Sequence, residues 1–214
     1  MVAYRKQQLV PRIEADSVAE HVRQQTERLL DVSSLLFKTK GYRATDMGVI
    51  AAEMGLARSS LYRYYPNKDH ILLACISRDM APLLDAFAAL TEKYTEPKER
   101  VVAWLNLQVD SATSSDCESM VLMSESRYAD SEFQTEIMAL HQQPRRVLEQ
   151  ALVEFDHLTD SEAQLLAKMI AAMTHAAVMH LMDQASFDLQ SISQVRDPLR
   201  KAVDRIIGAR EQRN

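Results

Sequence analysis

The sequence predicts an all-α protein, and three observations support that prediction. Only four of the 214 residues are Gly and six are Pro, whereas Ala, Leu, Met, Glu and Gln, which favour helices, are frequent. Apolar residues recur three and four positions apart over long stretches, as they do on one face of a helix. No run of alternating β-branched residues indicates a strand. With 47% apolar residues, the chain can bury the core of one medium-sized domain or two small ones.

The first predicted helix runs from about Asp16 to Lys40, with Asp16 or Ser17 as its N-cap. Its inner face repeats at helical spacing and consists of Val18, Val22, Leu29, Val32 and Leu36. Residues 1–15 contain Pro11 and three basic side chains, Arg5, Lys6 and Arg12. This segment is either a frayed terminus, the reading that we favour, or a basic arm that reaches DNA phosphates or the minor groove.

The stretch from Thr45 to Lys68 predicts two short helices joined by a tight turn. Thr45 can cap the first of them, whose apolar face consists of Met47, Ile50, Ala51 and Met54. Gly55 follows, where a helix that ends abruptly favours a left-handed residue, and Leu56 is apolar. The second helix begins near Ala57 or Arg58 and has only Leu61 and Tyr65 as inward-facing residues. This pattern is typical of a helix-turn-helix, whose second helix lies in the DNA major groove.

The spacing T-x-x-x-x-I-A-x-x-x-G-L-x-x-x-x-L-Y-x-Y-Y-x-N-K over residues 45–68 resembles the DNA-binding signature of the TetR family of bacterial transcription regulators. Four upstream residues resemble the approach to the first turn in that family: Leu36, Phe37, Gly41 and Tyr42. The chain departs from the family pattern at Ala57, Ser59 and Tyr65, where the family often has Ser, Gly and Phe. The resemblance covers about residues 29–72 and implies nine helices: a DNA-binding head, residues 1–67, and a body for ligand binding and dimerisation, residues 68–214.

The resemblance also implies which side chains contact DNA. Five positions match residues that lie at or near base edges: Arg58, Ser59, Ser60, Tyr62 and Arg63. Three further positions are expected to contact phosphates: Thr45, Tyr64 and Lys68. The charge distribution agrees with this assignment. Residues 1–70 hold 11 Lys and Arg against 8 Asp and Glu, a net charge of +3, whereas residues 71–214 hold 14 against 22, a net charge of −8.

Downstream of Pro66, the sequence predicts six more helices: 67–94, 97–114, one through residues 120–123, 131–155, 160–183 and 192–210. Asn67 is expected to cap the first of these, and Asp160 or Ser161 the fifth. Pro82 and Pro144 are expected to kink the helices in which they lie. The last two helices carry more apolar surface than they need to pack alone, at Leu165, Met169, Ala172, Ala176, Met179 and Ile206. One recognition helix reads too few base pairs for useful specificity, so a homodimer is expected. The family resemblance places its interface on these two helices.

Three polar residues fall on otherwise apolar arcs of the body helices: Gln108, His141 and His180. A buried polar group needs a partner, and neighbouring side chains, water or a bound ligand can supply it. In the ligand hypothesis, these three residues line a mostly apolar cavity whose walls are Trp104, Met120, Met123, Met138 and Met173. His175 shares a polar strip and is expected to be exposed.

Other functional classes lack positive signals. The sequence has no phosphate-binding glycine loop, nucleophile elbow, paired-Cys motif or His-Glu helix motif, and no cofactor is expected. His175 and His180 are five positions apart and do not converge on a metal. Cys75 and Cys117 are predicted to be free thiols in a reducing cytosol, and we expect a cytoplasmic protein without a signal peptide or membrane span. The sequence therefore predicts a repressor that a small apolar inducer releases from a palindromic operator. The alternatives are a protein-interaction module and a redox-sensing regulator.

Overall fold

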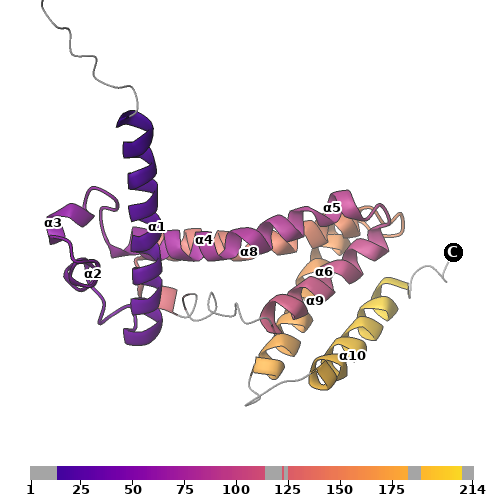
Figure 1. The fold of residues 1–214 in the computed structure, drawn as a ribbon. Helices are drawn as coiled ribbons and strands as arrows, with labels where there is room; N and C mark the ends of the chain where they lie inside the picture. Colours follow the sequence, from indigo (N-terminus) through magenta and orange to yellow (C-terminus); the bar gives the residue numbers. More distant parts are fainter. Residues whose placement is uncertain (1–13, 114–121, 123–124, 183–188, 209–214) are drawn as a thin grey trace, which may run out of the picture. The chain divides into compact units, whose positions relative to one another are not determined.

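The computed structural model describes residues 14–113, 122, 125–182 and 189–208, and every regular element within these ranges is helical. The elements, drawn in Figure 1, are α1 (Glu14–Lys40), α2 (Met47–Met54), α3 (Arg58–Leu61), α4 (Lys68–Ala88), α5 (Leu90–Lys93), α6 (Pro97–Thr113), the 3₁₀ helix η1 (Ser126–Tyr128), α8 (Ser131–Val153), α9 (Asp160–Met182) and α10 (Leu189–Gly208). The all-α prediction is confirmed. The predicted basic arm and most of the helix expected at residues 120–123 lie outside the described residues.

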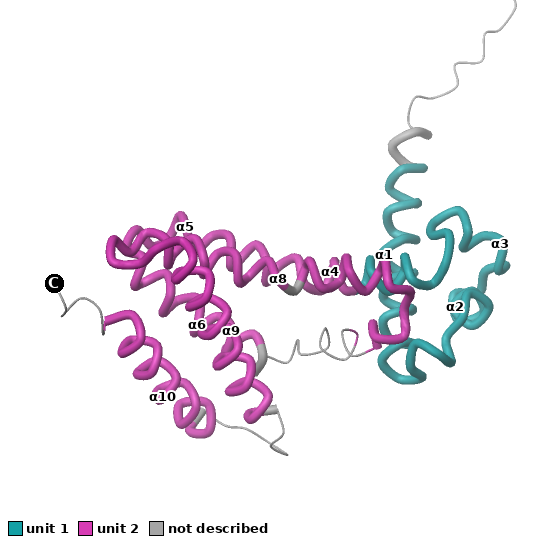
Figure 2. The backbone as a smooth tube through the Cα atoms, turned by 180° about the vertical axis from the view of Figure 1, so that it is seen from behind, with its two compact units in different colours: residues 1–75 teal, residues 76–214 magenta. Residues whose placement is uncertain are grey.

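The chain divides into two compact units, residues 1–75 and 76–214, which Figure 2 shows in different colours. The division falls within α4, eight residues after the predicted boundary at residue 67. We call the first unit the head and the second the body. Within the described ranges, no helix is long and apolar enough to cross a membrane.

The head is built on the second half of α1, against which α2 packs, and α3 packs on α2 in turn. The four predicted apolar residues of α2 are all buried, which confirms its inner face. In α1 the predicted face holds only in part. Leu29 and Leu36 are buried, but Val18 and Val22 are exposed, so their assignment to the inner face is wrong. Apolar spacing predicts which face of a helix is buried, but not over what length of the helix other elements cover that face.

Local side-chain hydrogen bonds define several helix starts. The Asn67 side chain accepts a hydrogen bond from the His70 backbone N–H at 3.1 Å, which confirms Asn67 as the cap of α4. At α9 the prediction of Asp160 or Ser161 is wrong, because Thr159 supplies the cap. The Thr159 hydroxyl accepts from the Glu162 N–H, and the Glu162 carboxylate accepts from the Thr159 N–H. This reciprocal arrangement is a capping box.

The body core lies between α6, α8, α9 and α10, which all contribute buried residues to one cluster. Trp104 of α6 is its largest fully buried side chain. Its ring centroid lies 5.9 Å from that of Phe87, and its indole N–H donates to the Pro144 carbonyl at 2.6 Å. Both α4 and α8 continue through their internal prolines, Pro82 and Pro144, and α10 does so through Pro198.

Candidate nucleic-acid interface

Gly55 reverses the chain between α2 and α3. It adopts the left-handed conformation, with φ 69° and ψ 28°, which an L side chain rarely occupies. Its N–H donates to the Ala52 carbonyl at 3.1 Å, and the Leu56 N–H donates to the Ala51 carbonyl at 2.9 Å. These two bonds satisfy the last carbonyls of α2 in a Schellman motif. The predicted glycine turn is confirmed.

The segment after this turn presents polar groups to solvent. Leu61 is fully buried and anchors it, while Arg58, Ser59, Tyr62 and Arg63 are exposed. The predicted residues Ser60 and Tyr64 are half-buried. α3 is shorter than expected, because regular helix ends at Leu61 and the chain continues in turns. The Tyr64 and Tyr65 N–H groups both donate to the Leu61 carbonyl, which holds these turns against the helix end.

The N-cap of α2 is Asp46 and not Thr45, as the sequence had suggested. The Asp46 carboxylate accepts from the Gly48 N–H at 2.7 Å and the Val49 N–H at 2.9 Å. The hydrogen bond from the Val49 N–H, and to a smaller extent that from the Gly48 N–H, lowers the pKa of the Asp46 carboxyl group. Thr45 is instead fully buried, and its hydroxyl donates to the Gly41 carbonyl at 2.9 Å. The expected phosphate contact by the Thr45 hydroxyl is corrected accordingly, since that side chain has no exposed surface.

Lys68 has a more specific environment than a free cation at a helix start. Its ammonium donates to the carbonyls of Tyr42 at 2.8 Å and Thr45 at 3.0 Å, and it lies 4.0 Å from the centroid of the Tyr42 ring. The Tyr42 hydroxyl donates to the buried carboxylate of Asp69. An ammonium group has three N–H donors, so these two bonds leave one for another acceptor.

We expect Lys68→Met, which keeps most of the aliphatic chain but removes the ammonium, to destabilise the head by about 1–3 kcal/mol. Two carbonyls lose a charged hydrogen-bond donor in this variant. Urea unfolding followed by circular dichroism measures the effect. Lys98→Met, at an exposed position of α6, is the matched control and should unfold like the wild type. Equal midpoints for Lys68→Met and Lys98→Met would show that the two carbonyl bonds contribute nothing.

Comparison with known proteins agrees with this head. Residues 29–75 match the family model described as bacterial regulatory proteins, tetR family. The chain also shares the fold of the TetR family transcriptional regulator PfmR from Thermus thermophilus, with a TM-score of 0.59, 20% identity, and coverage of 84% of this chain and 94% of that one. The N-terminal domain of this chain, residues 29–75, belongs to the TetR family.

A further relative and a further solved structure extend the comparison. The repressor KstR from Mycobacterium tuberculosis is 31% identical over 68 residues, which are 32% of this chain and 31% of KstR, so the match spans about a third of that relative. The regulator FadR from Bacillus subtilis, solved in complex with stearoyl-CoA, has a TM-score of 0.65 and 17% identity, and the match covers 83% of this chain and 96% of FadR.

In the body, the predicted ligand residues are not all brought together. Trp104 is a core residue with a satisfied indole N–H, and Met173 packs against the same core. Gln108 is half-buried. His180 is exposed, so its predicted place on the buried arc is wrong, and Met138 is 52% exposed and lines no interior wall. His175 is exposed as expected. Met120, Met123 and the side chain of His141 lie outside the described residues.

Two further side-chain sets in the described ranges bear on function. No three His, Cys, Asp or Glu residues there gather in a way that would hold a metal ion. Cys75 is buried, and its thiol donates to the Leu30 carbonyl at 3.4 Å. The second cysteine, Cys117, lies outside these ranges. Sequence reasoning also missed a pocket between α5, α6 and α8 whose lining includes three arginines and two glutamates.

Proposed function

We propose that this TetR-family protein is a homodimeric transcriptional repressor that binds a palindromic operator through the segment from Arg58 to Tyr64. The observation that carries the proposal is the exposure of this segment. Its arginines, Ser59 and Tyr62 face solvent while Leu61 and the Gly55 turn fix the backbone beneath them. Exposed guanidinium and hydroxyl groups on a rigid element suit the edges of bases in the major groove.

The side chains divide into two roles. Arg58, Ser59, Ser60, Tyr62 and Arg63 are assigned to base edges or positions next to them. Tyr64, through its hydroxyl, and Lys68, through its remaining N–H, are assigned to phosphates. Among the described residues, Arg58 and Arg63 have no hydrogen bond or ion pair that would have to break before DNA binds.

Fluorescence anisotropy with a labelled duplex of random sequence, about 30 base pairs long, tests DNA binding itself. We expect a dissociation constant of about 10⁻⁴–10⁻⁶ M at physiological salt and weaker binding as the salt concentration rises. Lys68→Met should reduce the slope of log K against log salt by about one unit, equally for all sequences. Absence of binding at low salt would argue for the protein-interaction alternative.

The dimer surface is assigned to an apolar stripe on α9 with a contribution from α10. Leu165 and Met169 are 58% and 46% exposed, and the exposed Ala172 and Ala176 continue the same face at helical spacing. Exposed large apolar groups in a row are typical of interaction surfaces. α10 contributes Ile206, which is half-buried.

The double variant Leu165→Glu/Met169→Glu is expected to be monomeric. Two carboxylates per subunit would face their copies across a two-fold interface, where like charges are strongly unfavourable. Sedimentation equilibrium measures the mass. Val153→Glu on α8, also exposed in the single chain, is the matched control and should remain dimeric. A dimeric Leu165→Glu/Met169→Glu variant would place the interface elsewhere.

Release from DNA is assigned to a small ligand in the body that binds better to a form whose two heads do not match half-sites about 34–36 Å apart. The structure of FadR with stearoyl-CoA supports ligand binding by a protein of this fold. Gln108 and Met173 remain candidates for contact with an apolar inducer. The redox alternative is disfavoured for Cys75, because a fully buried thiol is poorly accessible to oxidants.

A further inference from the structure

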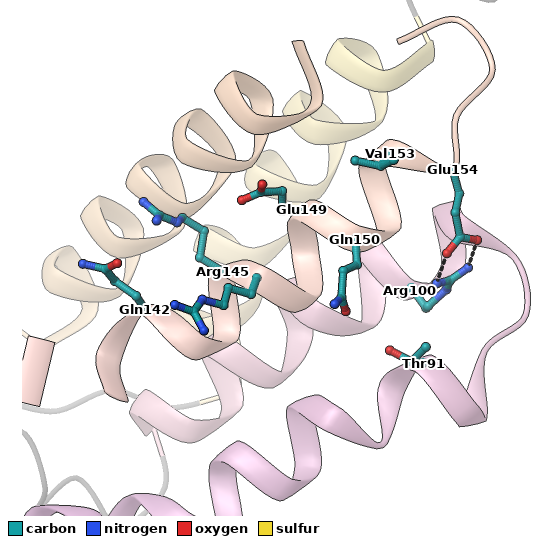
Figure 3. Close-up of a pocket in the computed structure, with 9 residues that line it drawn as sticks. Thr91, Arg100, Gln142, Arg145, Glu149, Gln150, Val153 and Glu154 are labelled. Carbon is teal, nitrogen blue, oxygen red and sulfur yellow. Dashed lines mark hydrogen bonds and ion pairs between the residues drawn. The ribbon is translucent and has the colours of Figure 1, made fainter. Parts of the chain in front are cut away.

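A second candidate site lies in the body, outside the predicted ligand set. Helices α5, α6 and α8 line an open pocket of about 780 Å³ that Figure 3 shows in close-up. None of the eight ligand residues predicted from the sequence lines it. Eight of the nine described residues that line it are polar or charged, and they include three arginines and two glutamates: Thr91, Arg100, Gln142, Arg145, Arg146, Glu149, Gln150, Val153 and Glu154.

One arginine and one glutamate of this pocket are already paired. Arg100 is only 4% exposed and donates two hydrogen bonds to the Glu154 carboxylate, one of them at 2.6 Å. It also donates to the Thr95 carbonyl at 3.1 Å. The hydrogen bond from Arg100 lowers the pKa of Glu154, which keeps the pair ionised and its net charge at zero. This pair is therefore a fixed part of the wall.

The two remaining arginines are available. Neither Arg145 nor Arg146 forms a hydrogen bond or ion pair with any described residue, although Glu149 is three and four positions away on the same helix. Arg145 is half-buried, and its Nε is buried without a partner. With Glu149 counted against them, the unpaired part of the pocket carries one net positive charge, within a region of the chain whose net charge is −8. An unpaired, partly desolvated guanidinium favours a planar or tetrahedral oxyanion, to which it donates two parallel hydrogen bonds.

We propose that the pocket between α5, α6 and α8 binds the carboxylate or phosphate group of a small organic anion through Arg145 and Arg146. Gln142, Gln150 and Thr91 are exposed neutral groups on the same wall and supply further hydrogen bonds to the ligand. The proposal rests on the ligand-responsive part of the proposed function and adds a second site, separate from Gln108 and Met173, whose ligand carries an anionic group.

Isothermal titration calorimetry of the 214-residue chain with benzoate, phenyl phosphate and neutral benzyl alcohol tests this site at fixed ionic strength. We expect at least one of the two anions to bind and benzyl alcohol not to bind, and the tighter anion identifies the preferred oxyanion. Arg145→Gln should weaken anion binding at least about tenfold, because a charged hydrogen bond is lost. Arg145→Lys keeps the charge but cannot donate two parallel hydrogen bonds, so its anion affinity should lie between those of the wild type and Arg145→Gln. Arg200→Gln, at an exposed position on α10, should bind like the wild type.

Binding of neither anion at millimolar concentration, equal binding of benzyl alcohol, or unchanged affinity in Arg145→Gln would overturn the proposal. Thermal melts confirm that each variant is folded. DNA binding is measured separately without the anions. Absence of DNA binding by the wild type would contradict the proposed regulator. DNA binding without anion binding would contradict only the anion site.

Discussion

The double variant Arg58→Ala/Arg63→Ala should bind a selected operator at least about 100-fold more weakly than the wild type. Each well-placed arginine contact contributes about 1–3 kcal/mol of binding free energy, and a dimer loses four such side chains. The loss should not come from unfolding. Both side chains are exposed and form no hydrogen bond or ion pair with the described residues, so the unfolding free energy should change by less than about 0.5 kcal/mol.

Anisotropy titrations with the operator and with a scrambled duplex measure this effect. The ratio of the two affinities should fall, because base contacts contribute to specificity and not only to overall attraction. Lys98→Ala, which removes an exposed charge from the body, should change neither affinity. Equal operator affinity in the double variant and the wild type would remove both arginines from the interface.

Trp104→Ala should destabilise the body by about 3–5 kcal/mol, the cost of removing a large fully buried aromatic side chain. It leaves a cavity between α6 and α8 beside Phe87 and removes the hydrogen bond to the Pro144 carbonyl. Trp104→Phe keeps a ring but not the N–H, so we expect a loss of about 1–3 kcal/mol. Urea unfolding at one protein concentration, followed by circular dichroism, measures both.

Met138→Ala is the matched control for Trp104, because the sequence placed both residues in one ligand cavity. Met138 is more than half exposed, so its truncation should cost less than about 0.5 kcal/mol. A loss below about 1 kcal/mol for Trp104→Ala would show that Trp104 is not the centre of the body core.

Features decided by local chemistry were predictable from the sequence. The left-handed Gly55, the apolar face of α2, the Asn67 cap and the start of α6 at Pro97 all depend on residues within one or two helical turns. At the two misassigned caps, the neighbouring side chain was better placed. Asp46 caps α2 where Thr45 was expected to do so, and Thr159 caps α9 where Asp160 or Ser161 was expected. Adjacent capping residues differ by a single backbone step, which composition alone does not resolve.

Features decided by tertiary packing were not predictable in the same way. A helical wheel shows that His180 lies among apolar residues, but not whether that arc meets the core or solvent. The exposure of Val18 and Met138 has the same origin. The arginine pocket joins residues 91, 100 and 142–154 from three helices, and no spacing within one helix reveals which charges remain unpaired.

Operator recognition is tested most directly by selection of bound duplexes from a random pool with the wild-type protein. We expect an enriched two-fold symmetric sequence whose half-sites are centred about one helical turn, 10–10.5 base pairs, or a multiple of it apart. A selection by Arg63→Ala in parallel should lose preference at one position of each half-site. Enrichment of no symmetric sequence by the wild type would contradict the proposed regulator.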